Sequence, residues 1–208
     1  MKGQIEPVSA ILITGILIGI VGSVYLWGVP LIEKNQDIAK IKNAELFMKD
    51  LNSRIKSVAN QGGRVEMRIT VPAVLQLGDL YNSAGVSGTD ARKDISLKLQ
   101  TKGTIYSSGG WVPLTDNGCD AGQRFLGSRG PDAMCVMAGS IGELYQNEYK
   151  LQYGELLSPP STAYRIDMIG NDQSGGENKI VVIEHAGSRV ENSGSVRTTV
   201  TEIRITVA

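Results

Sequence analysis

The sequence predicts an α+β protein, with one long N-terminal helix followed by an antiparallel β-sandwich-like head domain. Three patterns predict it: an uncharged apolar stretch near the N-terminus, a helical apolar stripe directly after it, and alternation of apolar and polar residues through the rest of the chain. The 208 residues suffice for one medium-sized domain with an anchor, or for two small domains. We expect residues 4–30 to form a transmembrane helix, 31–61 an amphipathic helix and 62–208 a β-rich head domain.

Composition supports this fold and excludes one class of partner. The formal net charge is +0, so no global basic excess favours nucleic acid, and we expect no nucleic-acid partner. Glycine is abundant, with 25 residues, whereas Phe and Trp number only 2 each. That mixture suits short strands joined by Gly-containing turns better than an aromatic-rich enzyme core.

The apolar stretch is long enough to cross a membrane. From Pro7 to Ile32 the chain runs 26 residues without a charge, and Tyr25 is the one ionisable side chain. As a helix this stretch is about 39 Å long, against about 30 Å for a bilayer core. Tyr25 and Trp27 lie near its far end, where aromatic residues favour the membrane interface. A buried core helix rarely runs this long without a polar face. The stretch is also too long for an ordinary cleaved signal peptide.

A short motif precedes the apolar stretch. Lys2-Gly3-Gln4, then a brief polar segment and a long apolar helix, resembles the class III signal peptide of archaeal type IV pilins and archaellins. In that family a prepilin peptidase cuts just after the Gly, and the apolar stretch stays on the mature protein. The resemblance implies that residues 1–3 are removed by a cut between Gly3 and Gln4. It covers about the first 30 residues, including a segment from Glu6 and Pro7 that is similar to the Pro-containing start of many archaeal pilin-like proteins.

Glu6 departs from the bacterial version of that pattern. Bacterial pilins place a Glu five residues into the mature chain, where it is thought to neutralise the new N-terminus of a neighbour. After a cut at Gly3, Glu6 is the third mature residue. Two interpretations stay open: the neutralising role, and a flanking carboxylate at the membrane interface.

Small residues gather on one face of the apolar stretch. Gly15 and Gly19 are four residues apart, and Gly22 and Ser23 continue the patch. Small residues let helix backbones approach closely in an apolar medium, which favours packing between copies. The alternative is that Gly is simply common in membrane helices. Further along, we expect Gly28-Val29-Pro30 to kink or interrupt the helix.

After Pro30 the sequence again predicts a helix, now with one apolar stripe. Apolar residues recur at three- and four-residue spacing from Ile38 to Val58, and Gln61-Gly62-Gly63 is a plausible stop. The stripe spans about three heptads, which is marginal for a free coiled-coil stalk. We therefore expect this half of the helix to pack on the head domain.

From Arg64 onward the pattern changes to that of strands. Alternation indicates one buried and one solvated face, as in antiparallel sheets. About eight strands are expected in a sandwich or partly open barrel, with turn-rich connections at 171–178 and 188–194. The candidate strands are 64–71, 95–101, 104–106, 111–114, 134–138, 148–154, 163–169, 179–185 and 195–207.

Two cysteines, Cys119 and Cys135, lie in the expected head domain. Joined, they close a 17-residue loop and stabilise the fold by about 3 kcal/mol in the chain-entropy model. An even count beyond a membrane helix favours this disulfide over two unpaired thiols. Two Cys with the single His185 make an incomplete zinc ligand set, so no metal or cofactor is expected.

Catalytic motifs are missing from the sequence. His185 ends an apolar run and is expected to be a strand-end residue. No Gly-x-Ser-x-Gly elbow, P-loop or zincin motif occurs. Oxygen-bearing side chains lie near glycine at 116–120 and 171–178, but neither segment has EF-hand spacing, and both are expected to be turns. We expect a protein that is not an enzyme.

Together, these features and the resemblance imply a structural subunit of an archaeal type IV pilus-like filament, used in adhesion or motility. The protein would begin as a single-pass membrane protein with a cytoplasmic N-terminus and an extracellular head. Its expected partners are copies of itself through the N-terminal helices, including Glu6, Pro7, Gly15, Gly19, Gly22 and Pro30, together with the membrane, the prepilin peptidase and the pilus assembly machinery.

Two other classes of function were compared with the filament subunit. A membrane-anchored extracellular binding module, such as a minor pilin or surface ligand-binding protein, would be supported by an exposed aromatic patch including Trp111 or Tyr106. A membrane-tethered hydrolase would need a catalytic cluster, which the sequence does not offer.

Overall fold

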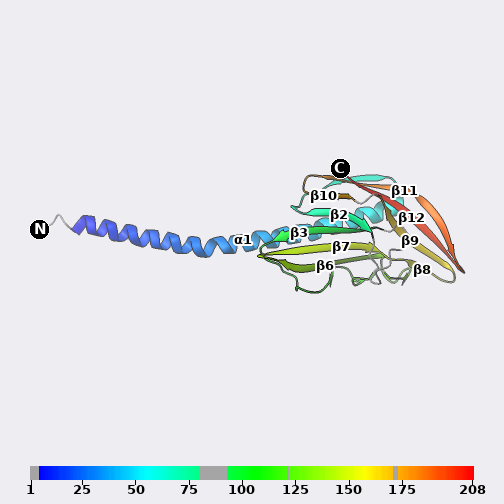
Figure 1. The fold of residues 1–208 in the computed structure, drawn as a ribbon, viewed down its shortest axis with the longest axis horizontal. Coiled ribbons are helices and arrows are strands. Elements are labelled where there is room, and N and C mark those ends of the chain that lie inside the picture. Colours follow the sequence, from blue (N-terminus) through cyan, green and yellow to red (C-terminus); the bar gives the residue numbers. More distant parts are fainter. Residues whose placement is uncertain (1–4, 80–92, 121, 171–172) are drawn as a thin grey trace.

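The computed structural model describes residues 5–79, 93–120, 122–170 and 173–208, with backbone alone at 5–8, 79, 93 and 173. It has the predicted α+β architecture: helix α1 (Ile5–Gln61) runs into a head built of two six-stranded sheets. Figure 1 shows about half of α1 projecting from the head and the other half running through it. The first described residues of α1 therefore lie far from the C-terminus, which is on the head.

The first sheet has the strand order β1-β11-β12-β9-β8-β5. Its pairings are antiparallel except for β12 with β9 and β5 with β8, which are parallel. Its strands are β1 (Arg64–Arg68), β5 (Arg124–Phe125), β8 (Leu156–Ser158), β9 (Thr162–Ile169), β11 (Ile180–Ser193) and β12 (Val196–Val207).

The second sheet has the order β10-β2-β3-β7-β6-β4 and is antiparallel throughout. Its strands are β2 (Val74–Asp79), β3 (Lys93–Thr101), β4 (Val112–Pro113), β6 (Asp132–Ile141), β7 (Leu144–Tyr153) and β10 (Gln173–Gly175). The alternation in the sequence accounts for its inner face. In β3, for example, Ile95, Leu97 and Leu99 are buried, whereas the residues between them are only partly covered.

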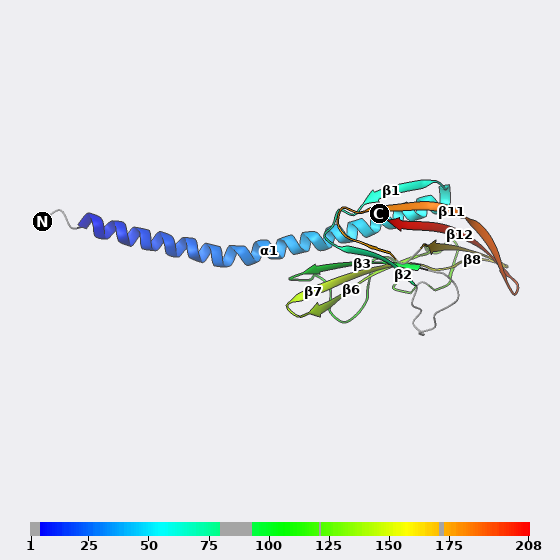
Figure 2. The same cartoon turned by 45° about the horizontal axis from the view of Figure 1, so that its top comes forward.

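The second half of α1 fills the space between the two sheets (Figure 2). It contacts β1, β11 and β12 of the first sheet and β3 and β7 of the second. The predicted packing on the head is therefore confirmed, and a free coiled-coil stalk is excluded for this segment. The buried apolar residues of this half are Ile41, Ala44, Phe47, Met48, Leu51, Ile55 and Val58.

Of the two outcomes expected at Gly28-Val29-Pro30, a kink or an interruption, the interruption does not occur. Helix α1 continues through Pro30 from Ile5 to Gln61, and Figure 1 shows a gentle bow rather than a break. Proline removes one backbone N–H from the helical ladder, but its fixed φ is compatible with a helix. One missing hydrogen bond bends a long helix without ending it. The predicted stop is confirmed: Gly62 (φ +75°) donates its N–H to the Val58 carbonyl at 2.9 Å, which caps the last turn.

The number of strands is larger than expected. Twelve strands occur among the described residues, against about eight predicted. Residues 104–106 form no strand, and strands β2, β5, β8 and β10 were not predicted. Three of these four have only two or three residues, too few for alternation to be recognised.

The segment around His185 also differs from the expectation. β11 does not end at His185 but passes through a register shift between His185 and Gly187 and continues to Ser193. The expected turn at 188–194 is thus mostly strand, because β12 pairs with it along its whole length. This long hairpin extends from the end of the head opposite to the free part of α1 (Figure 1).

Candidate functional site

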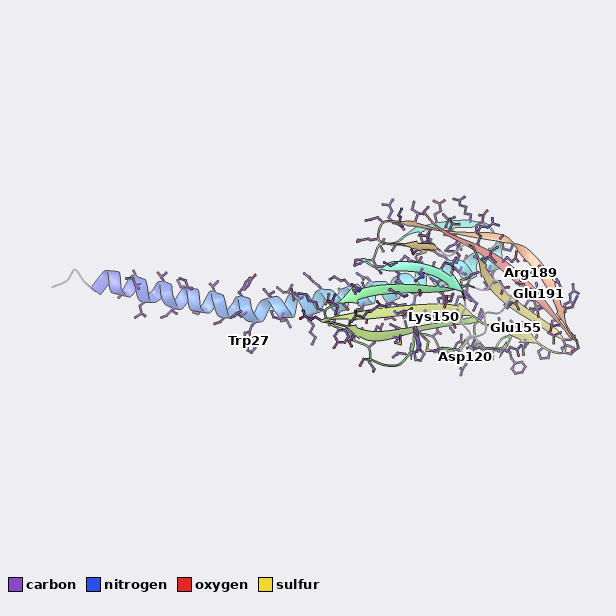
Figure 3. The ribbon with its side chains drawn as sticks, viewed as in Figure 1. Trp27, Asp120, Lys150, Glu155, Arg189 and Glu191 are labelled. Atoms are coloured by element: carbon purple, nitrogen blue, oxygen red, sulfur yellow. A yellow bond between two sulfur atoms is a disulfide. The ribbon has the colours of Figure 1, made fainter. Side chains whose placement is uncertain are left out.

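The candidate functional site is the part of α1 that leaves the head, residues 9–32, which we call the apolar stalk. Within the described part of the chain, α1 is the one helix long and apolar enough to cross a membrane, and none of its most apolar window is buried. Figure 3 shows Trp27 projecting from the stalk into open space. The first charged side chain after the stalk is Glu33, where α1 begins to meet the head.

The stalk exposes a large apolar surface. Full burial of one such side chain contributes about 1.5–3 kcal/mol, so leaving fourteen of them mostly in water forfeits on the order of 20 kcal/mol. That exceeds the roughly 5–15 kcal/mol of net stability of a typical domain. The stalk therefore needs an apolar environment. These side chains are Ile11, Leu12, Ile13, Ile16, Leu17, Ile18, Ile20, Val21, Val24, Tyr25, Leu26, Trp27, Leu31 and Ile32.

The small-residue face of the stalk is open. A Cβ built at Gly15, Gly19 or Gly22 would meet no described atom within 4 Å, apart from the neighbouring helix backbone. The polar side chains on the stalk are satisfied internally: the Ser23 hydroxyl donates to the Gly19 carbonyl and the Thr14 hydroxyl to the Ala10 carbonyl, both at 2.8 Å. Near the small-residue face, the stalk thus combines an uncovered helix surface with the hydrogen-bonded hydroxyls of Thr14 and Ser23, a combination suited to close helix contact in an apolar medium.

The residues of the processing motif are placed only in part. Gly3 and Gln4 lie outside the described residues, so their expected cleavage stays a prediction. Glu6 and Pro7 belong to the first turns of α1, where the backbone alone is described. Pro30 lies within the helix, close to the point where the stalk meets the head.

A group of polar contacts, which we call the polar collar, holds α1 where it enters the head. The collar is formed by Glu33, Asp37, Lys40 and Lys102. The Lys102 backbone N–H donates to Asp37 Oδ2 at 2.8 Å, and Lys40 Nζ lies 3.1 Å from Asp37 Oδ1. Burial acts to raise the pKa of Asp37, but these two hydrogen bonds outweigh it and the pKa is lowered. Lys102 Nζ also pairs with Glu33 at 2.9 Å. The end of β3 is thereby joined to the helix at two points.

Deeper in the head, tyrosines of β7 donate hydrogen bonds to α1. The Tyr149 hydroxyl donates to the Ile41 carbonyl at 2.8 Å, and the Tyr153 hydroxyl donates to Asn52 Oδ1 at 2.7 Å. Asn52 Nδ2 in turn donates to Asp132 Oδ2 at 2.8 Å. Burial raises the pKa of both tyrosines, so they stay neutral donors. These bonds fix the position of α1 along β7.

The sequence did not reveal this arrangement. The available signal was a polar residue, Asn52, beside the apolar stripe, and the spacing of Tyr149 and Tyr153, which places both on one face of a strand. Nothing in the sequence connected them, because Asn52 and Tyr153 are 101 residues apart.

The predicted disulfide is confirmed. Cys119 and Cys135 are bonded, with their Cα atoms 5.5 Å apart. The bond ties the loop before β6 to the outer face of the second sheet. Asn117 supports the loop by donating to the carbonyls of Gly130 (2.9 Å) and Asp132 (2.6 Å). Among the described residues no group of three or more His, Cys, Asp or Glu side chains is arranged to hold a metal.

The aromatic patch that would support a binding module does not form around Tyr106. The Tyr106 hydroxyl donates to Glu45 Oε2 at 3.1 Å, and its ring packs edge-on against Tyr149 with centroids 6.2 Å apart. Burial, together with the Glu45 carboxylate, raises the pKa of Tyr106 to about 12. Trp111 is 40% exposed, without Tyr106 as a neighbour on the open surface.

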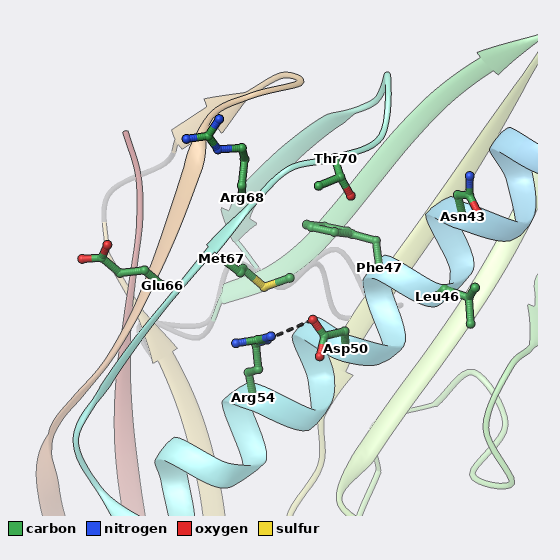
Figure 4. A pocket seen from close by; sticks show the side chains of 9 residues that line it. All are labelled: Asn43, Leu46, Phe47, Asp50, Arg54, Glu66, Met67, Arg68 and Thr70. Carbon is green, nitrogen blue, oxygen red and sulfur yellow. Dashed lines mark hydrogen bonds and ion pairs between the residues drawn. The ribbon is translucent and has the colours of Figure 1, made fainter.

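A hollow of about 730 Å³ lies between α1 and β1 (Figure 4). Phe47 of the helix and Met67 of the strand face one another across it, and the Asp50–Arg54 ion pair (2.9 Å) borders it. Its lining residues include no His, Cys or Ser. The hollow is an open cleft beside the core, and its lining residues do not indicate a catalytic reaction.

The first sheet carries a charged network that the sequence analysis missed. Arg165 on β9 pairs with Asp167 (2.7 Å) and with Glu191 on β11 (3.0 Å). The register places β12 between them, so the network spans three strands across Val200. Arg189 joins it through Asp167 and Glu202, and Figure 3 shows Arg189 and Glu191 toward the end of the head away from the stalk.

No protein-family model, curated protein or solved structure matches this chain.

Proposed function

We propose that this chain is a structural subunit of an archaeal type IV pilus-like surface filament. The stalk is the filament core, where it packs against stalks of other copies, and the head forms the outer surface. Before assembly the same stalk anchors the protein in the membrane, with the head outside the cell. The proposal includes the prepilin peptidase cut between Gly3 and Gln4 and recognition by the assembly machinery.

The observation that carries the proposal is the division of one helix into two halves. The second half is the core of the head, whereas the stalk is apolar on all sides and covered by none of the described head residues. A plain anchor needs only apolar length. The open face at Gly15, Gly19 and Gly22 adds a surface on which another helix can approach closely.

The first test is the intact mass of the protein isolated from its native envelope, together with electron microscopy of sheared surface material. A mass lacking residues 1–3 and abundant thin filaments are expected. An uncut N-terminus and no filaments would sink the proposal and leave a membrane-anchored binding module.

A second test uses the small-residue face. Gly19→Leu fills that face and should abolish filaments, because the backbones can no longer approach, while the chain still inserts in the membrane. Val24→Leu enlarges a residue on the opposite side of the stalk and is the matched control, expected to assemble. Equal filament yields from Gly19→Leu and the unmodified chain would contradict packing through this face.

A further inference from the structure

The β6–β7 hairpin ends in an apolar tip. Ile141 and Leu144 face one another across a two-residue turn of Gly142 and Glu143, and they are 53% and 37% exposed. Gly142 has φ +62°, as the first central residue of a tight type II′ hairpin turn does. Since this turn is short, the two apolar side chains stay at the surface instead of folding back on the head.

The tip lies level with the end of the stalk. Leu144 lines one small hollow with Glu33, Asp37 and Lys40 of α1 and with Lys102 at the end of β3. Figures 1 and 2 show this hairpin end beside the helix, pointing toward the N-terminal half. The tip is thus on the side of the head that faces the stalk.

The length of the stalk fixes how far this level is from a membrane. The uncharged stretch of 26 residues is about 39 Å long, about 9 Å longer than a bilayer core. Shared between both ends, the excess places Glu33 about 5 Å outside the hydrocarbon, within the headgroup layer. Leu144 lines the same hollow as Glu33, Asp37 and Lys40, so it lies within about 10 Å of the level of Glu33 along the helix, next to the headgroup layer.

We propose that, in the membrane-inserted protein, the β6–β7 tip rests in the lipid headgroup layer, so that the head meets the membrane at a second point beside the helix. The occupant of this surface is lipid. The inference rests on the membrane-anchored stage of the proposed function. It adds that the base of the head is itself a lipid-contacting surface, which restricts how far the head tilts.

The charge around the tip indicates which lipids are needed for this contact. The two lysines that line the hollow beside the tip are each paired with a carboxylate: Lys40 lies 3.1 Å from Asp37 and Lys102 lies 2.9 Å from Glu33. With no net charge, the contact is driven by Ile141 and Leu144, and anionic lipid is not required. Added salt is expected to leave it unchanged, because screening weakens charge attraction and not apolar contact.

The test places a polarity-sensitive fluorophore at the tip of the full chain in phosphatidylcholine vesicles. Both native cysteines are in the disulfide, so Glu143→Cys gives a single labelling site. Two further labels serve as references: Ile18→Cys within the stalk and Ser188→Cys on the exposed far hairpin. Each is exposed to lipids with a headgroup nitroxide quencher, to lipids with a nitroxide near the end of the acyl chain, which reaches the depth of Ile18, and, separately, to aqueous iodide.

We expect the Glu143 label to be quenched by the headgroup nitroxide and the Ser188 label by iodide alone, at low and high salt. Replacing both Ile141 and Leu144 with Ser should remove the nitroxide quenching at Glu143. Val190→Ser, at an exposed apolar residue of the far hairpin, is the matched control and should change nothing. Circular dichroism and an intact disulfide confirm that each variant is folded.

Three results would overturn the inference. If the Ile18 label is lipid-quenched but the Glu143 label behaves like the Ser188 label, the tip contact is absent while the anchor stands. If nitroxide quenching at the tip disappears as the protein is diluted in lipid, the surface contacts a second copy of the chain. If the Ile18 label is not lipid-quenched, the membrane-anchored stage itself fails.

Discussion

Substituting Leu51 tests whether the second half of α1 is truly part of the core of the head. Leu51 is 0% exposed and lies on α1 between the two sheets. Leu51→Ala removes its buried methyl groups and leaves a cavity, which costs about 3–5 kcal/mol at well-packed sites. Ala and Leu are both good helix formers, so the helix itself loses almost nothing. At about 2–4 °C per kcal/mol for a chain of this size, the melting temperature of the head should fall by roughly 6–20 °C.

The assay is thermal unfolding of the full chain in detergent micelles, followed by the β-sheet signal in circular dichroism. Leu46→Ala is the matched control, since Leu46 is on the same helix but 63% exposed, and it should shift the melting temperature by only a degree or two. Equal shifts for both variants would refute the claim that the second half of α1 belongs to the core of the head. They would mean that this half only touches the surface of the head.

Three further predictions concern the head. Replacing Cys119 and Cys135 with Ala should lower the free energy of unfolding by about 3 kcal/mol, measured by urea titration, and an unchanged value would contradict a stabilising loop closure. Gly175→Ala should destabilise by about 1–3 kcal/mol, because its Cβ would clash with a methyl group of Val207 on β12, whereas Gly176→Ala, with open space, should be neutral. The lowered pKa of Asp37 adds stability above its unfolded value near 3.8, which is lost as the pH falls through the lower folded-state pKa. Asp37→Asn should therefore flatten the loss of stability in that acid range, and identical pH profiles would refute the contribution.

Periodicity explains which parts of the fold were predictable. The stripe from Ile41 to Val58 recurs at helical spacing, and β3 and β12 alternate over seven or more residues, so each element could be assigned from the sequence. The stop at Gly62 was also predictable, since its positive φ suits glycine. These signals are local, and each is repeated several times along the chain.

The elements that could not be predicted depend on distant partners. β5 and β8 have two and three residues, and they are strands only because they pair with each other and with β9. The sequence at 188–193 reads as a turn, yet β12 pairs with it residue by residue. Pro30 did not interrupt α1, because the backbone hydrogen bonds of the helix continue on both sides of it.

The candidate site likewise has a part that was predictable from the sequence and a part that was not. The apolar length of the stalk and its lack of charge were predictable, because both are properties of the sequence itself, whereas the continuity of the helix through Pro30 was not. Its attachment was not, because Asp37 meets Lys102 and Asn52 meets Tyr153 only after folding. The apolar tip at Ile141 and Leu144 was also missed, because the expected strands ended at residue 138 and resumed at 148, whereas β6 and β7 continue to the turn.

A single helix of 57 residues, about 86 Å long, runs from the tip of the stalk to the centre of the head. No loop or helix break therefore separates the apolar stalk from the core of the head. Tension applied to the head acts along the helix axis. The polar collar around Asp37 and the hydrogen bonds donated by Tyr149 and Tyr153 then oppose sliding of α1 within the head. In the proposed filament, a pulling force would extract either the stalk from its neighbours or the second half of α1 from the head, and the weaker of these two attachments would set the force at which a subunit fails.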